Sequence, residues 1–339
     1  MNGIAKIIYD TYKGNIPTKY ASVSKSERDE AIRKELLNAL GIEKFERKAF
    51  RRAWAKNKHE VYAVIEEVVN QVMVDGEYQK SAFFNQFVEV KNLALGDTNE
   101  FYVEGKNELI VSEFSGSHFD LRRQRIDAGQ TFPVAVRDYG IKVYEYFERI
   151  LSGRASIENL VTLLYEAIDK KLSEIAESTF MVAMEKLPTP FKVGGNYDED
   201  AILEMLAHLE ATNGEKPILV GTKMALRKLQ GIVGGEWSDG MKETRNNALV
   251  LPVWNSYTCM EIAQGHKIGS FEFTMPNNKV YAISGSNTKL VKMVLEGDTL
   301  VKEISDGTDN ADMSLETAVI FKAGVAVAYN KMIGEISLA

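Results

Sequence analysis

The 339-residue sequence contains one cysteine, Cys259, and only four histidines. A single cysteine cannot form an internal disulfide, and it excludes zinc modules built from several cysteines. No two histidines stand at metal-ligand spacing, because His59-Glu60 is followed by Ala63 where a zinc protease needs its second histidine. We therefore expect no metal site and no cofactor, and a stability that comes from packing.

The sequence also lacks long apolar runs. None reaches the 18 or more residues that a membrane-spanning helix needs. The first 17 residues hold only a short apolar patch, interrupted by Lys6 and Asp10, without the core or cleavage site of a signal peptide. We expect a protein that is made and kept in a cytoplasm and has no membrane partner.

Motifs of the common enzyme classes are missing as well. There is no Gly-x-x-x-x-Gly-Lys-Ser/Thr phosphate loop and no Gly-x-Gly-x-x-Gly. Ser22 and Lys25 match a Ser-x-x-Lys nucleophile by spacing, but Ser24 and Glu27 overlap them and form a capping box that opens a charged helix. These absences predict a protein that is not an enzyme.

What is present is an average globular composition with an uneven charge. Hydrophobic residues make up 45% and charged residues 26% of the chain, enough for a sizeable core in about two domains. Residues 1–60 hold 14 lysines and arginines against 8 acidic residues, a net of +6, and the rest carries −13 of the total of −7. Such a basic segment meets nucleic acid, an acidic neighbour or simply solvent.

Residues 1–75 show helical patterns and no strand pattern. Apolar residues at helical spacing lead to Gly41, which predicts a helix end. A second, looser apolar stripe over residues 43–74 includes Trp54 and Val68. Because the segment has too few apolar residues for a core of its own, we expect an arm whose stripe packs on something else.

Residues 84–147 change to strand character. Residues 87–90 alternate with period two, and turn signals follow at Gly96-Asp97 and at residues 105–107. This pattern predicts two successive hairpins in a projecting β element. Arg122, Arg123 and Arg125 follow, and their guanidinium groups suit carboxylates of a neighbouring subunit, although a solvated strand face is the alternative.

The strongest pattern is a long amphipathic helix. Ser156 is a suitable N-cap, apolar residues recur at helical spacing up to Leu187, and Pro188 and Pro190 end the helix. Residues 157–186 make a helix of roughly 45 Å at 1.5 Å per residue. This length predicts a rod that forms the backbone of a domain.

Residues 195–305 alternate between helix and strand after a glycine link at residues 194–196. We expect a helix over 201–209, a strand over 217–220, a helix capped by Thr222 and a polar loop over 231–247. Strands are expected over 249–253, 258–262 and 280–283, with a hairpin over 290–304 that turns at Gly297-Asp298. The tail predicts two paired strands, 318–321 and 325–329, around Gly324.

This order of elements, carried by residues 131–147, 156–187, 216–221 and 318–329, resembles that of the major capsid proteins of tailed bacteriophages. The resemblance implies an α+β, HK97-like capsid fold. It divides the chain into a helical N-terminal arm (1–75), an extended β-hairpin loop (84–136), a peripheral domain (137–194 and 306–339) with a spine helix (156–187), and an α/β axial domain (195–305).

The same resemblance implies a subunit that assembles with itself, as hexamers and pentamers, into an icosahedral head around double-stranded DNA. Portal, scaffolding or decoration proteins would be further partners, packaged DNA would meet the inner face without sequence specificity, and the protein would reside in the virion after assembly in a bacterial host cytoplasm. Two alternatives stand beside it. One is an encapsulin-like nanocompartment shell, against which the long basic arm argues, and the other is an enzyme with its site in residues 195–305.

Overall fold

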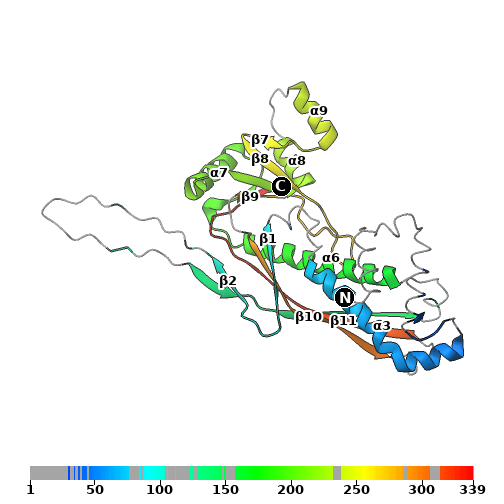
Figure 1. Ribbon diagram of the computed structural model, residues 1–339. Coiled ribbons are helices and arrows are strands. Elements are labelled where there is room, and N and C mark those ends of the chain that lie inside the picture. The colour runs from blue at the N-terminus through cyan, green and yellow to red at the C-terminus, as the bar shows by residue number, and fades with distance from the viewer. Residues whose placement is uncertain are drawn as a thin grey trace.

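The computed structural model describes residues 30, 34, 37–38, 40–43, 46–75, 84, 87–103, 105, 111, 123–124, 129–146, 149, 157–231, 238–285, 289–305 and 314–338. Within these residues the chain forms two large sheets and a separate pair of strands (Figure 1). The two sheets lie at different levels of the molecule, and a long helix runs between them (Figure 1).

The four-stranded sheet has the order β1 (Val88–Leu93), β10 (Val291–Ser305), β11 (Ser314–Val327) and β4 (Arg137–Tyr146). β1 runs parallel to β10, and the other neighbours are antiparallel. The sheet therefore joins strands that stand about 200 residues apart in the chain, with Val88 opposite Val291.

The six-stranded sheet has the order β5 (Lys192–Gly195), β12 (Gly334–Leu338), β9 (Lys279–Ser284), β6 (Pro217–Thr222), β8 (Tyr257–Ile262) and β7 (Val253–Trp254). β6 pairs in parallel with β8 and antiparallel with β9. The separate two-stranded sheet pairs β2 (Glu100–Val103) with β3 (Gln130–Pro133).

The described helices are α3 (Arg47–Asp75), α6 (Ile157–Met184), the short 3-10 helix η2 (Thr189–Phe191), α7 (Glu199–Asn213), α8 (Lys223–Gly231) and α9 (Asp239–Ala248). Local chemistry sets several of their ends. The Asp198 carboxylate accepts a hydrogen bond from Ala201 N at 3.2 Å at the start of α7, and Gly214 ends that helix in the left-handed region. The Thr222 hydroxyl likewise accepts from Ala225 N at 3.3 Å and caps α8, as the sequence predicts.

The core is continuous along α6. Its buried stripe, Leu172, Ala176, Phe180 and Met184, is 0% exposed and repeats every four residues. α6 packs on β11 and β10, and its Phe180 ring meets the Tyr281 ring of the six-stranded sheet edge-on at 5.0 Å. The predicted long helix is therefore confirmed, and it joins the cores of both sheets.

The six-stranded sheet is covered on both faces. Along β9, Tyr281 and Ile283 belong to the cluster that includes α6, whereas Val280 and Ala282 belong to the cluster with α7 and α8. This alternation follows from the two-residue period of a strand.

The described part of the arm contributes to the core. Trp54 and Val68 of α3 are buried in the same cluster as Leu172, and Leu37 and Leu40 join them. The apolar stripe of this segment is therefore covered in part by the protein's own body, which is one surface on which the expected arm packs. The capping box at Ser24 and Glu27 lies outside the described residues.

Two expected hairpins are continuous strands. β10 runs unbroken from Val291 to Ser305, and Gly297, with φ of 73°, lies where the register shifts between Glu296 and Leu300. β11 likewise runs through Gly324 without a turn. Each glycine marks an irregularity or a close contact inside a strand, and both strands pair with each other over their length.

The first of the two expected hairpins in residues 84–136 is also wrong. β1 does not pair with β2 across the turn at Gly96; it pairs with β10, and β2 pairs with β3 instead. The second expected turn and the strand after it lie largely outside the described residues. β10, which lies within the expected 195–305 region, pairs with β1 and β11 in the four-stranded sheet, and β12 of the C-terminal region pairs with β5 and β9 in the six-stranded sheet.

The region after α8 was misjudged in two places. Residues 239–248, expected within a polar loop, form α9, and of the expected strand 249–253 only Val253 is in a strand. The glycine link at 194–196 contributes to β5. The strands expected near 217–220, 258–262 and 280–283 are confirmed by β6, β8 and β9.

Candidate functional site

The base of the β2–β3 pair is the first candidate surface for assembly, because these two strands form a sheet separate from the two large sheets. Glu100 lies opposite Pro133, and Val103 lies opposite Gln130. Gly129, with φ of 76°, precedes the return strand, and a Cβ there would lie 2.4 Å from Val103 O. Only glycine fits this position, so the backbone path at the base is fixed by the sequence.

A small apolar cluster anchors this base on the four-stranded sheet. Phe101, Val134 and Val294 are buried together, and the Phe101 and Phe132 rings stack with centroids 6.1 Å apart. The Asn99 amide donates a hydrogen bond to Val134 O at 2.5 Å. The base is thus held by packing and by a hydrogen bond across 35 residues.

Charged side chains surround the same anchor. Lys292 of β10 is buried, and its ammonium group pairs with the Glu89 carboxylate on β1, directly opposite in register. The Lys91 ammonium lies 4.4 Å from the centroid of the Phe101 ring and donates to Glu100 O at 2.7 Å. The sequence shows that a lysine interrupts the apolar run of β10, which suggests a buried charge. It does not indicate that the partner of this lysine is Glu89, 203 residues away.

The spine helix carries a perturbed carboxyl group on its way between the sheets. Glu177 of α6 is partly buried and faces Thr274, in the loop between β8 and β9. Burial raises the pKa of Glu177, the nearby Thr274 hydroxyl opposes the shift, and the negative charge of Glu174 raises the pKa further. The net effect is a carboxyl group that resists ionisation where this loop meets the spine helix.

A second buried acid lies in the six-stranded sheet. Glu335 of β12 is 0% exposed, and its carboxylate lies 3.0 Å from the Lys279 ammonium and 3.7 Å from that of Lys192. The three side chains come from adjacent strands. Burial, and then the negative charge of Glu335, raise the pKa of Tyr281. This group stabilises the joint of three strands rather than facing a ligand.

The predicted arginine run is only partly visible. Arg123 is exposed, which is compatible both with an interface and with a solvated face. Arg122 and Arg125 lie outside the described residues. Whether the three act together stays a prediction.

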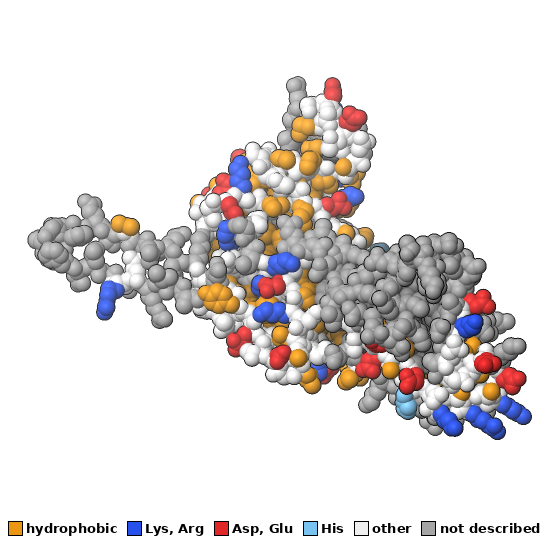
Figure 2. All heavy atoms as spheres, viewed as in Figure 1, with side chains coloured by type: hydrophobic (Ala, Val, Ile, Leu, Met, Phe, Trp, Pro, Cys, Tyr) orange, Lys and Arg blue, Asp and Glu red, His pale blue; other side chains and the backbone are white. Residues whose placement is uncertain are grey.

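Charges at the α3 end are mixed. Lys48, Arg52 and Lys56 are exposed on α3, and exposed Glu60 follows one turn later. Figure 2 shows side chains of both signs intermixed at this end of the molecule. The described side chains of α3 therefore do not form a uniformly positive face.

The described histidines and Cys259 are the side chains to consider for metal binding or nucleophilic chemistry. No group of three or more histidine, cysteine or acidic side chains there is placed to hold a metal ion, and His59, His208 and His266 are exposed. Burial raises the pKa of the Cys259 thiol, against the opposing hydrogen bond from Gln230, so this thiol is a poor nucleophile. Within the described residues, no helix combines the length and apolar character that crossing a bilayer requires.

The arrangement of a spine helix, two sheets and a projecting strand pair is that of a known class. The mature capsid protein of bacteriophage PhiM1 aligns with this chain with a TM-score of 0.52 at 9% sequence identity, over 76% of this chain and 86% of that one. The chain thus has the HK97-like capsid fold.

Two further solved structures align with lower TM-scores than the PhiM1 chain. A chain of Microbacterium phage Oxtober96 is 12% identical, over 76% of this chain and 91% of its own, with a TM-score of 0.46. The virus-like particle from Pyrococcus furiosus is 13% identical, over 80% and 98%, with a TM-score of 0.42. No curated protein matches the sequence.

A family model covers nearly the whole chain. It is described as "SPbeta prophage-derived putative capsid protein YonB" and matches residues 6–337. The chain belongs to this family of prophage-derived capsid proteins, and its role is that of a shell protein. The family favours a phage capsid over the nanocompartment shell.

Proposed function

We propose that copies of this chain assemble as hexamers and pentamers into an icosahedral head that encloses double-stranded DNA. The observation that carries the proposal is the family match over residues 6–337. The role is structural and not catalytic, and the place of the protein is the virion, after assembly in the cytoplasm of a bacterial host.

Each of the two large sheets belongs to a different part of the proposed capsid subunit. The four-stranded sheet with α6 is the peripheral body, and the six-stranded sheet with α7, α8 and α9 is the axial body. Residues 84–136 hold the extended loop, with its base at β2 and β3, and residues 1–75 are the arm. Support comes from the separate sheet orders and from α9, whose described side chains are exposed and free to meet neighbours around an axis.

Further partners follow from the shell. A portal protein at one vertex, scaffolding or decoration proteins, and packaged DNA on the inner face, bound without sequence specificity, belong to the proposal. The basic character of residues 1–60 supports a contact with DNA or with an acidic neighbouring surface.

Electron microscopy of the purified protein tests the proposal. We expect closed, uniform shells in negative stain, and particles that sediment far ahead of the 38.0 kDa subunit. A protein that stays monomeric across concentration, salt and coexpression with its neighbouring phage genes would overturn it.

The proposed arginine contact has its own test. Replacing Arg122, Arg123 and Arg125 together by Ala should reduce assembly most at low ionic strength, because exposed ion pairs are already screened at high salt. The matched Lys triple variant keeps the charge and should retain more assembly. Equal assembly of all three proteins at every ionic strength would show that the run is a solvated face.

A truncation tests the role of the arm. Removing residues 1–29 leaves Leu37, Leu40 and Ile42 in place, so the buried cluster that they join is preserved. The truncated protein should fold with a thermal midpoint close to that of the full chain and form fewer closed shells. Normal shells at normal yield would remove the arm from the assembly contacts.

A further inference from the structure

The loop over residues 263–278, which joins β8 to β9, exposes a group of large apolar side chains. Phe271 is 95% exposed, and Ile268 and Phe273 are each 49% exposed. We call these three residues, two of which are aromatic, the aromatic tip. Single exposed apolar residues are common on protein surfaces, but three within six positions of one loop are a patch.

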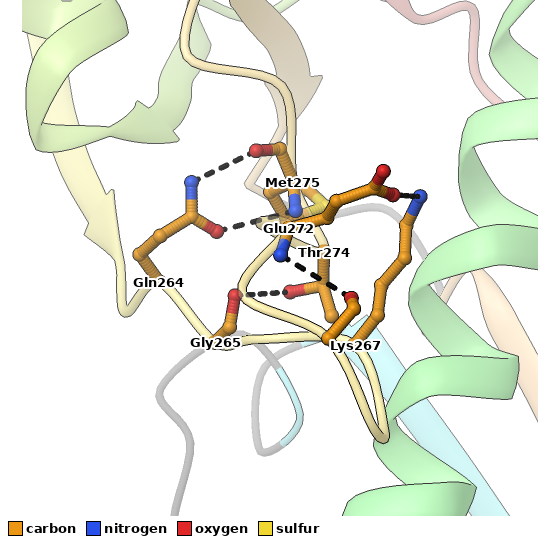
Figure 3. A network of polar contacts seen from close by, with 7 residues as sticks. Gln264, Gly265, Lys267, Glu272, Thr274 and Met275 are labelled. Carbon is orange, nitrogen blue, oxygen red and sulfur yellow. Dashed lines mark hydrogen bonds and ion pairs between the residues drawn. The ribbon is translucent and has the colours of Figure 1, made fainter.

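The base of the loop is rigidly held. The Gln264 amide donates to Met275 O at 2.8 Å, and its oxygen accepts from Met275 N at 3.2 Å. Thr274 N donates to Gly265 O at 3.0 Å, and the Thr274 hydroxyl donates to the same oxygen at 3.3 Å. Figure 3 shows the two Gln264–Met275 contacts and the contact of the Thr274 hydroxyl with Gly265 O, which join the two sides of the loop.

The end of the loop is held as well. Lys267 N donates to Glu272 O at 2.9 Å, and Ser270 N donates to Lys267 O at 3.2 Å, in a turn that Gly269 permits with φ of 75°. The Lys267 ammonium pairs with the Glu272 carboxylate at 3.0 Å (Figure 3). The His266 ring stacks on Phe273 with centroids 5.3 Å apart.

A rigid apolar projection is suited to docking. Its backbone is already ordered, so a partner does not have to immobilise a flexible loop on binding. Large aromatic side chains of this kind supply most of the binding free energy at many protein interfaces. The exposure of Phe271 is therefore built into the loop and does not come from a loosely held chain.

The charges of the loop and of the whole chain favour a second copy of this chain over DNA as the partner that binds the aromatic tip. The only formal charges within the loop over residues 263–278 are Lys267 and Glu272, which neutralise each other, so the aromatic tip offers no positive field to DNA. Each chain carries a net charge of −7, and identical copies repel one another unless their contacts are uncharged or paired. A neutral apolar tip meets that requirement.

We propose that the aromatic tip of one copy of this chain docks on a second copy in the assembled shell. The proposal rests on the proposed function, since it needs a shell of identical copies, and it assigns one contact of that shell to Ile268, Phe271 and Phe273. Shells multiply such contacts over many subunits, so that a modest loss at each contact has a large effect on the whole.

Substitution of Phe271 is a clean test because the side chain is almost fully exposed in the single subunit. Phe271→Ser should leave the circular dichroism spectrum and thermal midpoint of the subunit unchanged. It should lower the fraction of protein in particles by about tenfold or more at a fixed concentration, measured by sedimentation. Phe271→Leu keeps an apolar side chain and should restore most of the assembly. Wild-type assembly of Phe271→Ser would overturn the proposal while leaving the proposed function intact.

Site-specific crosslinking identifies what the tip touches. A photoreactive phenylalanine analogue at position 271, irradiated in purified particles, should yield an adduct with twice the subunit mass. An adduct of another mass, or none, would overturn the proposal. Failure of the wild-type protein to form particles at all would overturn the proposed function and this contact together.

Discussion

Single residues decide where the strands of this protein can cross. Gly324 of β11 lies beneath the segment that leads from β3 to β4: a Cβ at position 324 would lie 2.5 Å from Ala135 O and 3.0 Å from Val134 Cγ1. The glycine therefore lies where the segment between β3 and β4 passes close to β11. It does not form the turn that its neighbours in sequence suggest.

Replacing Gly324 by Ala should destabilise the unassembled subunit by about 1–3 kcal/mol, because the added methyl group must displace backbone atoms. The measurement is urea denaturation followed by circular dichroism. Gly140→Ala on the adjacent strand is the control, since its Cβ would meet Val319 O at an ordinary 3.5 Å. Equal midpoints for the two variants would contradict this close crossing.

Glu177 makes stability depend on pH. Burial raises its pKa above the ordinary 4.5, so the ionised form costs free energy in the folded state. Below the ordinary pKa both folded and unfolded states are protonated and this cost vanishes; it grows as the pH rises through the ordinary value toward the raised one. Ionisation of Glu177 therefore opposes folding at neutral pH.

Glu177→Gln should accordingly raise the thermal midpoint at pH 7 and change it less as the pH falls below 4.5, since glutamine carries no charge at any pH. Differential scanning calorimetry of both proteins across pH 4 to 8 measures the difference. A variant that is less stable at pH 7, or a difference that is constant with pH, would show that the carboxylate is stabilised by its surroundings.

At the scale of elements, α6 holds the molecule together. Its buried stripe touches the four-stranded sheet along most of its length and reaches the six-stranded sheet through Phe180. The opposite face is open, with Leu163 65% exposed. One helix with two unlike faces therefore serves both cores and leaves a surface for neighbours.

Truncation of two leucines on opposite faces of α6, Leu172 and Leu163, should separate these roles. Leu172→Ala, at a position that is 0% exposed, should cost about 2–5 kcal/mol of unfolding free energy through the lost contacts and the cavity. Leu163→Ala should change the stability of the unassembled subunit by no more than about 0.5 kcal/mol. Chemical denaturation of both variants provides the comparison, and similar losses would mean that the helix is turned differently.

Elements with local signals were predictable from the sequence. α6, α7 and α8 have regular apolar spacing with caps, and β6, β8 and β9 are short apolar runs between turns. The pairing of β1 with β10 was not predictable, because its partners share no local signal. The sequence Gly297-Asp298 is compatible with both a hairpin turn and a strand irregularity, and only the partner strand β11 decides between them.

The candidate surfaces were predictable only in outline. A projecting β element was expected between residues 84 and 136, but its base at β2 and β3 depends on the contact of Phe101 with Val294, which are distant in sequence. The aromatic tip has no helical or strand period, and it is defined by exposure, which a sequence does not show. The arginine run was evident from sequence, and its contacts stay a prediction.

For the whole molecule, assembly and stability should be linked. Subunits in a shell bury surface that the free subunit exposes, and any partner that binds only the folded state raises the unfolding temperature. At concentrations about 1,000 times the dissociation constant this amounts to roughly 4 kcal/mol per subunit contact.

Isolated particles should therefore unfold at a higher temperature than subunits of the same preparation. Scanning fluorimetry of the two fractions, separated by sedimentation and matched in protein mass and buffer, is the measurement. The Phe271→Ser subunit serves as the unassembled control. Identical midpoints for particles and subunits would mean that contacts between copies contribute little to the folded state.

The late position of β10, β11 and β12 in the chain has a consequence for synthesis. β10 and β11 are the two central strands of the four-stranded sheet, and β12 lies between β5 and β9 in the other. A nascent polypeptide that ends before residue 291 thus lacks the middle of one sheet and an inner strand of the other. We expect that fragments released early from the ribosome lack the strands that complete both sheets and so cannot join an assembly of complete copies.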